Sequence, residues 1–290
     1  KSAFMTKDYI GRFAPSPTGL LHAGSLVAAL ASFIDAKAHH GQWLIRIEDV
    51  DESRCKKEWA EGILNVLRQL QMNSDAPIIW QSQRKDRYAE VLQSLINTDR
   101  AYGCSCTRHS IEAINRQKGL PTHYYPGICR NGPHGPIRAW RFLTDRKMIS
   151  FTDRWFGDYS QNVEETVGDF IIKRADGLFA YQLAVVVDDH DSYVTDIVRG
   201  ADLIDNTPRQ LAIYHALGWN EPRYMHIPLV LNERHEKLSK QAGARPLGCD
   251  LMRELNQAWI HLGFELINAR NFSDFYSQAS LQWFNRFLRQ

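Results

Sequence analysis

The sequence has no hydrophobic run long enough to cross a bilayer, which argues against a membrane-spanning protein. A transmembrane helix needs about 20 consecutive apolar residues, and no stretch of the 290-residue chain approaches that length. The N-terminus also lacks the apolar segment of a signal peptide. We take Met5 as the natural start and leave the four residues before it out of the fold argument. A cytoplasmic protein with no membrane partner is therefore expected.

Cysteine is scarce, and charge of neither sign is in excess. An odd number of cysteines, five, fits a reducing compartment better than a disulfide framework. The 35 basic and 33 acidic side chains give a formal net charge of +2, which neither requires nor excludes a nucleic-acid partner. Such a partner would need a local basic patch. The length allows one substantial core and a smaller inserted or appended domain.

Strands and helices alternate in the first third of the chain. Apolar periodicity predicts these elements, in chain order, at 9–14, 20–40, 43–47, 56–72 and 86–96. This alternation predicts an α/β fold with a parallel sheet of the Rossmann type and helices on both faces.

The alternation breaks between residues 101 and 167. This part contains three of the cysteines, a loop rich in proline and glycine, and a β-like stretch at 137–143, so we predict an inserted α+β module. Alternation resumes in the segments 170–173, 183–187, 195–199, 207–217 and 226–231. The predicted domains are therefore two halves of the sheet domain, the inserted module and a short C-terminal helical segment, at 9–100 with 168–245, 101–167 and 246–290.

The stretch GRFAPSPTGLLHAGSLVAAL, residues 11–30, leads from an extended segment directly into a helix. Pro15 and Pro17 keep the segment from becoming helical early, and Gly24 lets a ligand approach the backbone closely. The first N–H groups of a helix lack partners and form the positive end of its dipole, so they are an anion site. His22 adds a donor that can contact a nucleotide phosphate. The alternative is a proline-rich turn with a surface histidine that caps the helix.

A second segment, EKLSKQ, places Lys237 and Lys240 on either side of Ser239 in a polar loop that follows a predicted strand. Two lysines three residues apart can hold the outer phosphates of ATP and stabilise charge on the leaving pyrophosphate. Taken alone, the segment is equally compatible with an ordinary solvated loop.

Together the two segments resemble the signature pair of class I aminoacyl-tRNA synthetases. His22-Ala23-Gly24-Ser25 is similar to the motif HIGH, and KLSKQ at 237–241 is similar to KMSKS; each departs at its last residue. The flanking sequences look like the catalytic core of glutamyl-tRNA synthetases, in the same order over residues 9–245: GRFAPSPTG, IRIEDVD, FAYQLAVVVDDH, VTDIVRGADL and NTPRQ.

This resemblance implies a site for an amino acid with two carboxylates. Such a substrate needs buried arginines, an acid for its ammonium group and a hydroxyl donor. The implied glutamate site consists of Arg12, Phe13, Ala14, Pro15, Ser16, Glu48, Tyr181 and Arg199. The implied catalytic residues are His22, Ser25, Lys237 and Lys240, and the implied ATP contacts are His22, Gly24, Ser25, Lys237, Ser239 and Lys240. For the charged residues the alternative is an ordinary ion pair at a strand end.

Two departures from glutamyl-tRNA synthetases indicate a narrower family. The segment 246–290 is too short for the helical domain that grips the anticodon, and HAGSLVAAL and RGADL stand where HVGGARTAL and RGEDH are expected. Both features look like the glutamyl-Q tRNA(Asp) synthetase family. That resemblance implies ATP, Mg²⁺ and L-glutamate as ligands. It also implies transfer of glutamate to the queuosine base in the anticodon stem-loop of tRNA(Asp).

The inserted module contains three closely spaced cysteines, Cys104, Cys106 and Cys129. Three thiolates suggest a structural Zn²⁺ site, which needs a fourth ligand. His123 and His134 are of the more common ligand type, whereas the family resemblance implies Tyr125, four residues before Cys129. We favour Tyr125; the alternative is a set of buried cysteines without a metal. The full expected fold is thus a Rossmann-type parallel sheet, an inserted zinc-bearing α+β module and a short C-terminal helical segment.

Three other functions remain as alternatives. The first is a truncated glutamyl-tRNA synthetase that acts on tRNA(Glu). The second is a nucleotidyltransferase of the same superfamily, which would leave the glutamate-like flanks unexplained. The third is a non-catalytic zinc-bearing RNA-binding module, which the presence of Lys237, Ser239 and Lys240 argues against.

Overall fold

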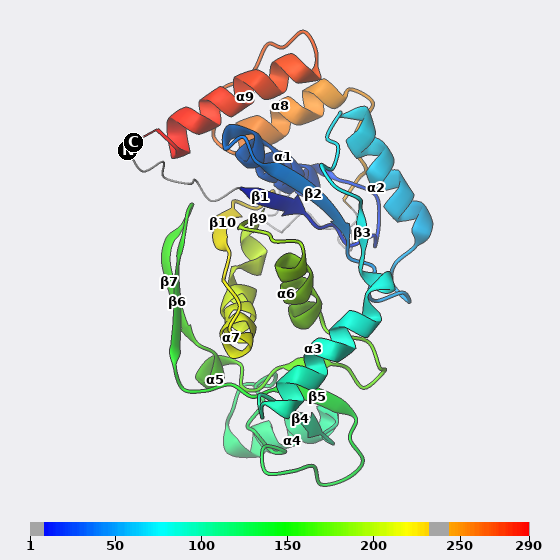
Figure 1. Ribbon diagram of the computed structural model, residues 1–290, viewed down its shortest axis with the longest axis vertical. Helices are drawn as coiled ribbons and strands as arrows, with labels where there is room; N and C mark the ends of the chain where they lie inside the picture. The colour runs from blue at the N-terminus through cyan, green and yellow to red at the C-terminus, as the bar shows by residue number, and fades with distance from the viewer. Residues whose placement is uncertain (1–8, 232–243, 290) are drawn as a thin grey trace, which may run out of the picture.

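A parallel sheet forms the centre of the computed structural model, which describes residues 9–231 and 244–289 (Figure 1). The parallel neighbours in its first group are β1 (Ile10–Phe13), β2 (Gln42–Ile47) and β3 (Ile79–Trp80). A second parallel pair consists of β9 (Asp196–Gly200) and β10 (Arg223–Ile227). The two groups meet where the Thr195 amide donates to the Ile10 carbonyl at 2.9 Å. The predicted α/β architecture is confirmed.

One face of the sheet is covered by α1 (Ala23–Ala38). The C-terminal helices α8 (Leu251–His261) and α9 (Phe272–Phe287) pack on the outer side of α1 (Figure 1). Because α1 is enclosed by the sheet and by these two helices, most of its side chains are buried. The more exposed α2 (Lys57–Gln69) is amphipathic and buries only one side, as its sequence period predicts.

The other face carries α6 (Tyr181–Asp191) and α7 (Thr207–Leu217), which pack against each other (Figure 1). A 3-10 turn, Ala201–Asn206, leads into α7. The apolar run at 183–187 lies in α6, which is buried on nearly all sides and therefore shows no polar face. Even so, no helix in the described part of the chain is long and apolar enough to span a membrane.

The inserted segment builds a separate antiparallel sheet. After a 3-10 turn (Gln81–Gln83), α3 (Lys85–Asn97) leads to β4 (Ala101–Cys104), α4 (Arg108–Lys118) and β5 (Ala139–Phe142). The prediction that the segment 170–173 resumes the parallel sheet is wrong. This segment is β8 (Ile171–Lys173), which pairs antiparallel with β5. A three-residue apolar strand carries no sequence signal for the direction of its partner.

A long hairpin connects the inserted sheet to the central one. It consists of β6 (Met148–Asp153) and β7 (Gly157–Asn162), followed by the short helix α5 (Val163–Thr166). In Figure 1 the hairpin runs alongside α7 from the inserted part toward β10. At its upper end the Arg154 amide donates to the Tyr224 carbonyl of β10 at 2.9 Å. The turn of the hairpin is therefore fixed to β10 of the central sheet.

Candidate functional site

His22 caps α1 with its own ring. Its Nδ1 accepts hydrogen bonds from the Gly24 and Ser25 amides at 3.1 and 3.3 Å, and the Ser25 hydroxyl accepts from the His22 amide at 3.0 Å. Helix α1 therefore begins at Ala23, later than predicted, because His22 keeps an extended backbone. The ring also satisfies two of the amides that the sequence assigned to a phosphate.

The capping geometry determines which ring nitrogen of neutral His22 carries the proton. Because Nδ1 of His22 is an acceptor, the ring proton lies on Nε2, which is then a donor. His22 is only 8% exposed, so it is not the surface residue of the alternative interpretation. The first turn of α1 contains no acidic residue. The helix end thus keeps a positive character, with a histidine donor added to it.

The chain returns to His22 after the segment that carries the lysine motif. Lys237, Ser239 and Lys240 lie outside the described residues. On the far side of that segment, Pro246 forms a β-bridge with His22, and the Leu247 amide donates to the Leu21 carbonyl at 3.3 Å. The first residues described after that segment therefore lie beside the N-terminus of α1.

Arg12 and Glu48 belong to one buried ion-pair network. The Arg12 guanidinium donates to Asp189 from Nε and one terminal nitrogen, at 2.9 and 3.2 Å. Arg46 donates to Asp189 at 2.6 Å and to Glu48 at 3.1 Å, so it connects the two carboxylates. All four side chains are buried. The sequence analysis missed Arg46 and Asp189, although buried charges always need partners and both residues lie within motifs that it used.

The network determines which of its carboxyls holds a proton most readily. Burial would raise the pKa of Asp189, but Arg12 and Arg46 outweigh burial and hold that pKa below its ordinary value. For Glu48 the burial effect prevails over Arg46 and Arg12, so its pKa is raised. Asp189 is thus the permanent anion of the network, and Glu48 is the carboxyl most easily protonated.

Three of the predicted glutamate-site residues share a pocket. Ser16, Glu48 and Tyr181 line a pocket of about 430 Å³, together with residues that include Arg54, Gln81 and Arg174. Burial raises the pKa of Tyr181, and the nearby cations Arg199 and Arg12 oppose this rise. Tyr181 thus lines the pocket and lies within electrostatic reach of both predicted arginines.

The predicted residues between Arg12 and Ser16 act through the backbone or the core. The Phe13 side chain is buried and stacks on Trp43, with ring centres 6.4 Å apart. The Pro15 carbonyl accepts from the Glu48 amide at 3.0 Å. These residues hold the start of the segment against β2, and the described structure does not direct the Phe13 ring into the pocket.

Arg199 is a buried cation whose protein partners are all neutral. Its guanidinium donates to His226 Nε2 at 3.1 Å, to Gln210 at 2.9 Å and to Thr207 at 2.8 Å. The side chain is 4% exposed, and no carboxylate among the described residues pairs with it. A buried positive charge without a counter-charge is costly unless a ligand supplies one. Arg199 is therefore the strongest candidate for a carboxylate contact.

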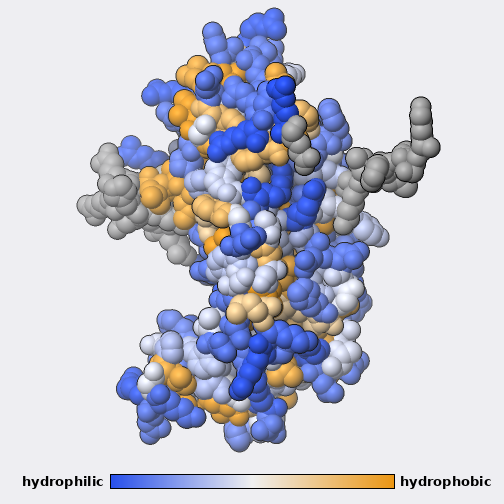
Figure 2. Space-filling model, turned by 90° about the vertical axis from the view of Figure 1, so that its left-hand side faces the viewer, coloured by the Kyte–Doolittle hydropathy of each residue, from blue (hydrophilic) through white to orange (hydrophobic). Residues whose placement is uncertain are grey.

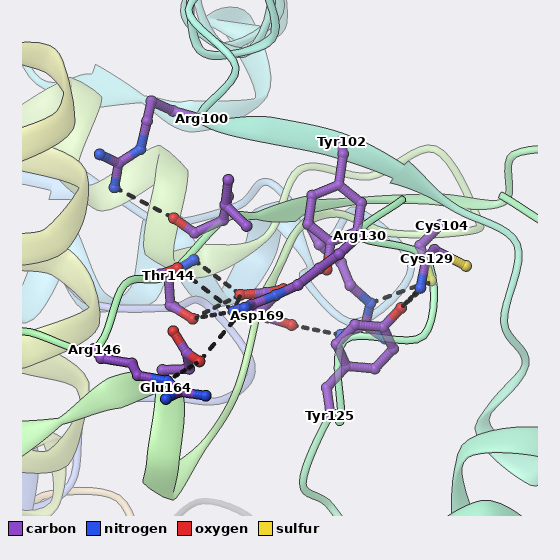
Figure 3. Close-up of polar contacts among 12 residues, drawn as sticks. Arg100, Tyr102, Cys104, Tyr125, Cys129, Arg130, Thr144, Arg146, Glu164 and Asp169 are labelled. Carbon is purple, nitrogen blue, oxygen red and sulfur yellow. Dashed lines mark hydrogen bonds and ion pairs between the residues drawn. The ribbon is translucent and has the colours of Figure 1, made fainter. Parts of the chain in front are cut away.

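The three predicted cysteines converge in the inserted module. Figure 3 shows two of them, Cys104 and Cys129, beside Tyr125. The Cys106 and Cys129 sulfurs are 3.6 Å apart, and the Tyr125 hydroxyl lies 3.5 Å from the Cys104 sulfur. A tetrahedral site with Zn–S bonds of about 2.3 Å spaces its sulfurs about 3.8 Å apart. The spacing of these four donor atoms thus fits a tetrahedral zinc site with three cysteines and one tyrosine.

The competing histidine ligands do not join this cluster. His123 and His134 are both exposed, and His134 Nε2 faces the Ile128 carbonyl at 3.3 Å. Arg141 lies against the cluster instead: it donates to the Cys104 sulfur at 3.3 Å, and its guanidinium carbon is 3.6 Å from the centre of the Tyr125 ring. A cation in this place offsets negative charge on the thiolates.

The neighbouring Asp169 ties the module together (Figure 3). This fully buried carboxylate accepts hydrogen bonds from the Tyr102 hydroxyl at 2.5 Å and from Thr144 at 2.6 Å, and it pairs with Arg130 at 2.6 Å. The three partners come from β4, from the segment after Cys129 and from the segment after β5. Asp169 was not predicted from the sequence, since its partners are distant along the chain.

A groove of about 500 Å³ lies between the cysteine cluster and α7. Its lining includes Arg108, Arg138 and Arg209, and Gln182 of α6 also lines it. Gln182 accepts from Gln210, which in turn accepts from Arg199, so the groove borders the candidate carboxylate site. The space-filling view shows the molecule hollowed on one side between the sheet part and the inserted part (Figure 2).

Comparisons with known proteins show the family of the chain. Residues 10–262 match the family described as tRNA synthetases class I (E and Q), catalytic domain. Two relatives named glutamyl-Q tRNA(Asp) synthetase are similar over nearly the whole chain. The one from Cupriavidus metallidurans is 48% identical, covering 97% of this chain and 93% of that protein. The one from Bordetella bronchiseptica is 49% identical, covering 97% of this chain and 90% of that protein.

Solved structures of glutamate-specific enzymes share the fold. A glutamate tRNA ligase from Elizabethkingia meningosepticum, crystallised with its amino acid, superposes with a TM-score of 0.73 at 30% identity. The similarity covers 82% of this chain but 53% of that one. A glutamate-tRNA synthetase from Elizabethkingia anophelis gives a TM-score of 0.72. The present chain thus spans about half the length of these structures.

Proposed function

The chain belongs to the catalytic-domain family of class I tRNA synthetases for glutamate and glutamine, and is thus a ligase; we propose that it transfers glutamate to queuosine in tRNA(Asp). Relatives named glutamyl-Q tRNA(Asp) synthetase support this choice at 48% identity over 97% of the chain. The observation that carries the proposal is the buried Arg199, which has no carboxylate partner among the described residues.

Glutamate is held by charges of both signs. Arg199 binds one of its carboxylates, because this cation alone among the candidate arginines has no counter-charge in the described part of the molecule. Glu48 accepts from the α-ammonium group, and Tyr181 donates its hydroxyl to a carboxylate. Arg12 keeps the local potential positive while paired with Asp189. With Arg199 on the side-chain carboxylate, this set selects glutamate over glutamine, since a side-chain amide would leave Arg199 without its anion.

The first step forms an acid anhydride without a protein nucleophile. The α-carboxylate oxygen of glutamate attacks the α-phosphorus of ATP, which enters as its magnesium complex, and the bond to pyrophosphate breaks. His22 donates from Nε2 to the phosphate oxygens, and the positive end of the α1 dipole stabilises the charge that develops on them. Ser25 orients His22 through the capping contact. Lys237, Ser239 and Lys240 are proposed to hold the leaving pyrophosphate.

The second step forms an ester on RNA. A hydroxyl of the queuosine cyclopentene ring attacks the carbonyl carbon of the glutamyl-adenylate, and AMP leaves. The acceptor base must therefore reach the α-carboxyl carbon of the bound glutamate. The groove lined by Arg108, Arg138 and Arg209 borders the Arg199 site through Gln182 and offers cations for RNA phosphates.

A zinc ion is the proposed structural centre of the inserted module. Cys104, Cys106, Cys129 and Tyr125 would hold it, since their donor atoms have tetrahedral spacing. When bound, the ion cross-links β4 to the loop that contains Tyr125 and Cys129. Its role is to hold the module in shape rather than to take part in the reaction.

The test of the proposed function is glutamate-dependent exchange of pyrophosphate into ATP, measured with and without tRNA. We expect exchange with glutamate alone, and none with aspartate or glutamine. Exchange only in the presence of tRNA would instead support a truncated glutamyl-tRNA synthetase. No exchange under either condition would support the non-catalytic RNA-binding module.

The acceptor is tested separately with labelled glutamate. The substrates are two anticodon stem-loops of tRNA(Asp), identical except that one carries queuosine and the other guanosine at the same position. Label is expected on the queuosine-containing RNA alone. Label on tRNA(Glu), or equal labelling of both stem-loops, would contradict the proposed acceptor.

A further inference from the structure

We infer that Asp153 and His226 form a hydrogen-bonded chain that orients the Arg199 guanidinium for its substrate carboxylate. The three residues come from distant parts of the sequence: the end of β6, β10 and β9. Neither Asp153 nor His226 lines the pocket of Glu48 and Tyr181. Both are therefore positioning residues, and the inference rests on the proposed role of Arg199 in glutamate binding.

The first link joins His226 to Arg199. The two residues are direct partners in the parallel pairing of β9 and β10, so their side chains lie on the same face of the sheet. Arg199 Nε donates to His226 Nε2 at 3.1 Å. His226 is completely buried, and its Nε2 also lies 3.2 Å from the Thr207 hydroxyl. The ring is thus enclosed, and it contacts the Arg199 guanidinium through Nε2.

The second link joins His226 to Asp153. His226 Nδ1 donates to Asp153 Oδ2 at 2.6 Å, and the His226 amide donates to the same oxygen at 2.9 Å. The other oxygen, Oδ1, accepts from the Trp155 and Phe156 amides in the hairpin turn, both at 3.0 Å. Because four donors surround this carboxylate, it cannot rotate or donate.

The chain determines the tautomer of His226. Asp153 accepts a hydrogen bond from Nδ1–H of His226, so the ring proton lies on Nδ1. Nε2 is therefore the unprotonated acceptor that faces Arg199 Nε–H. A guanidinium has five N–H donors. The bonds to His226, Gln210 and Thr207 use one on each nitrogen, which leaves one N–H on each terminal nitrogen within the described structure. Two such donors suit a carboxylate bound by both oxygens.

This arrangement makes the inserted hairpin part of the substrate site. Asp153 ends β6, which lies in the segment that interrupts the sheet domain. The adjacent Arg154 amide donates to the Tyr224 carbonyl of β10, two residues before His226. A displacement of the hairpin turn would therefore pass directly to the ring that holds Arg199.

The decisive variant is Asp153→Asn, which keeps the shape but changes the donor pattern. An amide nitrogen facing His226 Nδ1 would drive the proton to Nε2, and Nε2–H would then oppose Arg199 Nε–H. Calorimetric titration with L-glutamate is expected to show roughly tenfold weaker binding, the cost of one lost charge-assisted hydrogen bond. Nitrogen NMR of ¹⁵N-histidine protein is expected to show His226 change from the Nδ1–H to the Nε2–H tautomer.

Two further variants separate positioning from general damage. Thr152→Val removes the exposed 2.7 Å contact to Asp158 in the same hairpin and is expected to leave glutamate affinity unchanged. In a His226→Gln background the Gln oxygen can accept from Arg199 without help. There, Asp153→Asn is expected to have little further effect on affinity. Equal losses with and without His226 would overturn the inference.

The outcomes for the two proposals are distinguishable. If the wild-type protein binds glutamate and Asp153→Asn binds it equally well, the positioning chain alone is wrong. Equal weakening by Thr152→Val and Asp153→Asn would also overturn it, because the effect would then come from the hairpin as a whole. A wild-type protein that does not bind glutamate would overturn both the chain and the proposed function.

Discussion

Asp189 balances two buried arginines at the sheet. It accepts hydrogen bonds from Arg12 and Arg46, and Arg46 in turn pairs with Glu48. Asp189 is 1% exposed, so water cannot replace it as the counter-charge. Without this carboxylate the two guanidiniums would repel each other next to the proposed ammonium site.

We therefore expect Asp189→Asn to be strongly destabilising. Breaking a buried ion pair on one side costs about 3–5 kcal/mol, and the loss should appear as a lower free energy of unfolding in urea. Glutamate affinity should fall as well, because Arg46 no longer holds Glu48 in place. The matched control is Asp191→Asn on the same helix, whose partners Arg84 and Arg87 are more exposed. A similar affinity loss in both variants would contradict the role of Asp189.

The family resemblance, together with residue type, predicted several of these charges but not their partners. Arg12, Arg199 and Glu48 stood out because a substrate with two carboxylates requires such groups. The partner of Arg12 lies 177 positions away in the sequence, and only the packing of α6 on the sheet brings it close. The neutral surroundings of Arg199 could not be predicted either, since they depend on side chains from two other elements, β10 and α7.

At the scale of elements, one glycine fixes the loop that carries Tyr125. Gly168 has a φ of +81° and forms a β-bridge with Tyr125. A Cβ added at Gly168 would lie 2.1 Å from the Tyr125 carbonyl oxygen. Both the backbone conformation and the close contact therefore require glycine. Glycine at position 168 therefore allows the loop that carries Tyr125 to approach the turn before β8.

Gly168→Ala is expected to displace Tyr125 and reduce the zinc content of the purified protein, as measured by atomic absorption. The wild type should contain about one zinc per chain, and Cys129→Ser should contain far less. The control is Gly177→Ala, which has a φ of +85° but nothing within 4 Å of the added Cβ. It shares the strained conformation without the clash and should keep its zinc. Zinc loss in the control, or none in Gly168→Ala, would contradict this account.

Elements that are partly exposed were the most predictable from the sequence. The predicted helices at 56–72, 86–96 and 207–217 agree with α2, α3 and α7, because periodicity or end signals mark them. The run at 183–187 had no period because α6 is buried on nearly all sides. The predicted start of α1 at residue 20 was too early. His22 keeps an extended backbone because its ring accepts hydrogen bonds from the first turn of the helix, whereas the sequence analysis assigned that ring to a phosphate.

At the scale of the whole molecule, Asp35 connects three separate parts of the chain. This fully buried carboxylate of α1 pairs with Arg154 at 2.6 Å, just beyond the inserted β6. It also accepts from the Trp283 indole of α9 at 2.8 Å and from the Tyr9 hydroxyl at 2.5 Å. The sheet domain, the hairpin and the C-terminal helices thus share one anion, and the three regions should unfold together.

This shared anion predicts how stability depends on pH. Burial would raise the pKa of Asp35, but the hydrogen bonds and charge of Arg154 hold it below the ordinary value. A depressed folded-state pKa adds stability above the unfolded pKa of about 3.9, and this stability is lost as pH falls through the folded pKa. Asp35→Asn should therefore be about 3 kcal/mol less stable than wild type at pH 7. That difference should shrink progressively below about pH 4.

Urea unfolding followed by tryptophan fluorescence at a series of pH values measures this difference. The control Asp75→Asn changes a more exposed carboxylate that accepts from the Trp43 amide at 2.8 Å, and it should cost little at pH 7. A stability difference for Asp35→Asn that stays constant down to pH 3 would mean that packing around the side chain, rather than its charge, holds the three regions together. Separate unfolding transitions in the wild type would contradict the shared anchor itself, because a common anion couples the parts it joins.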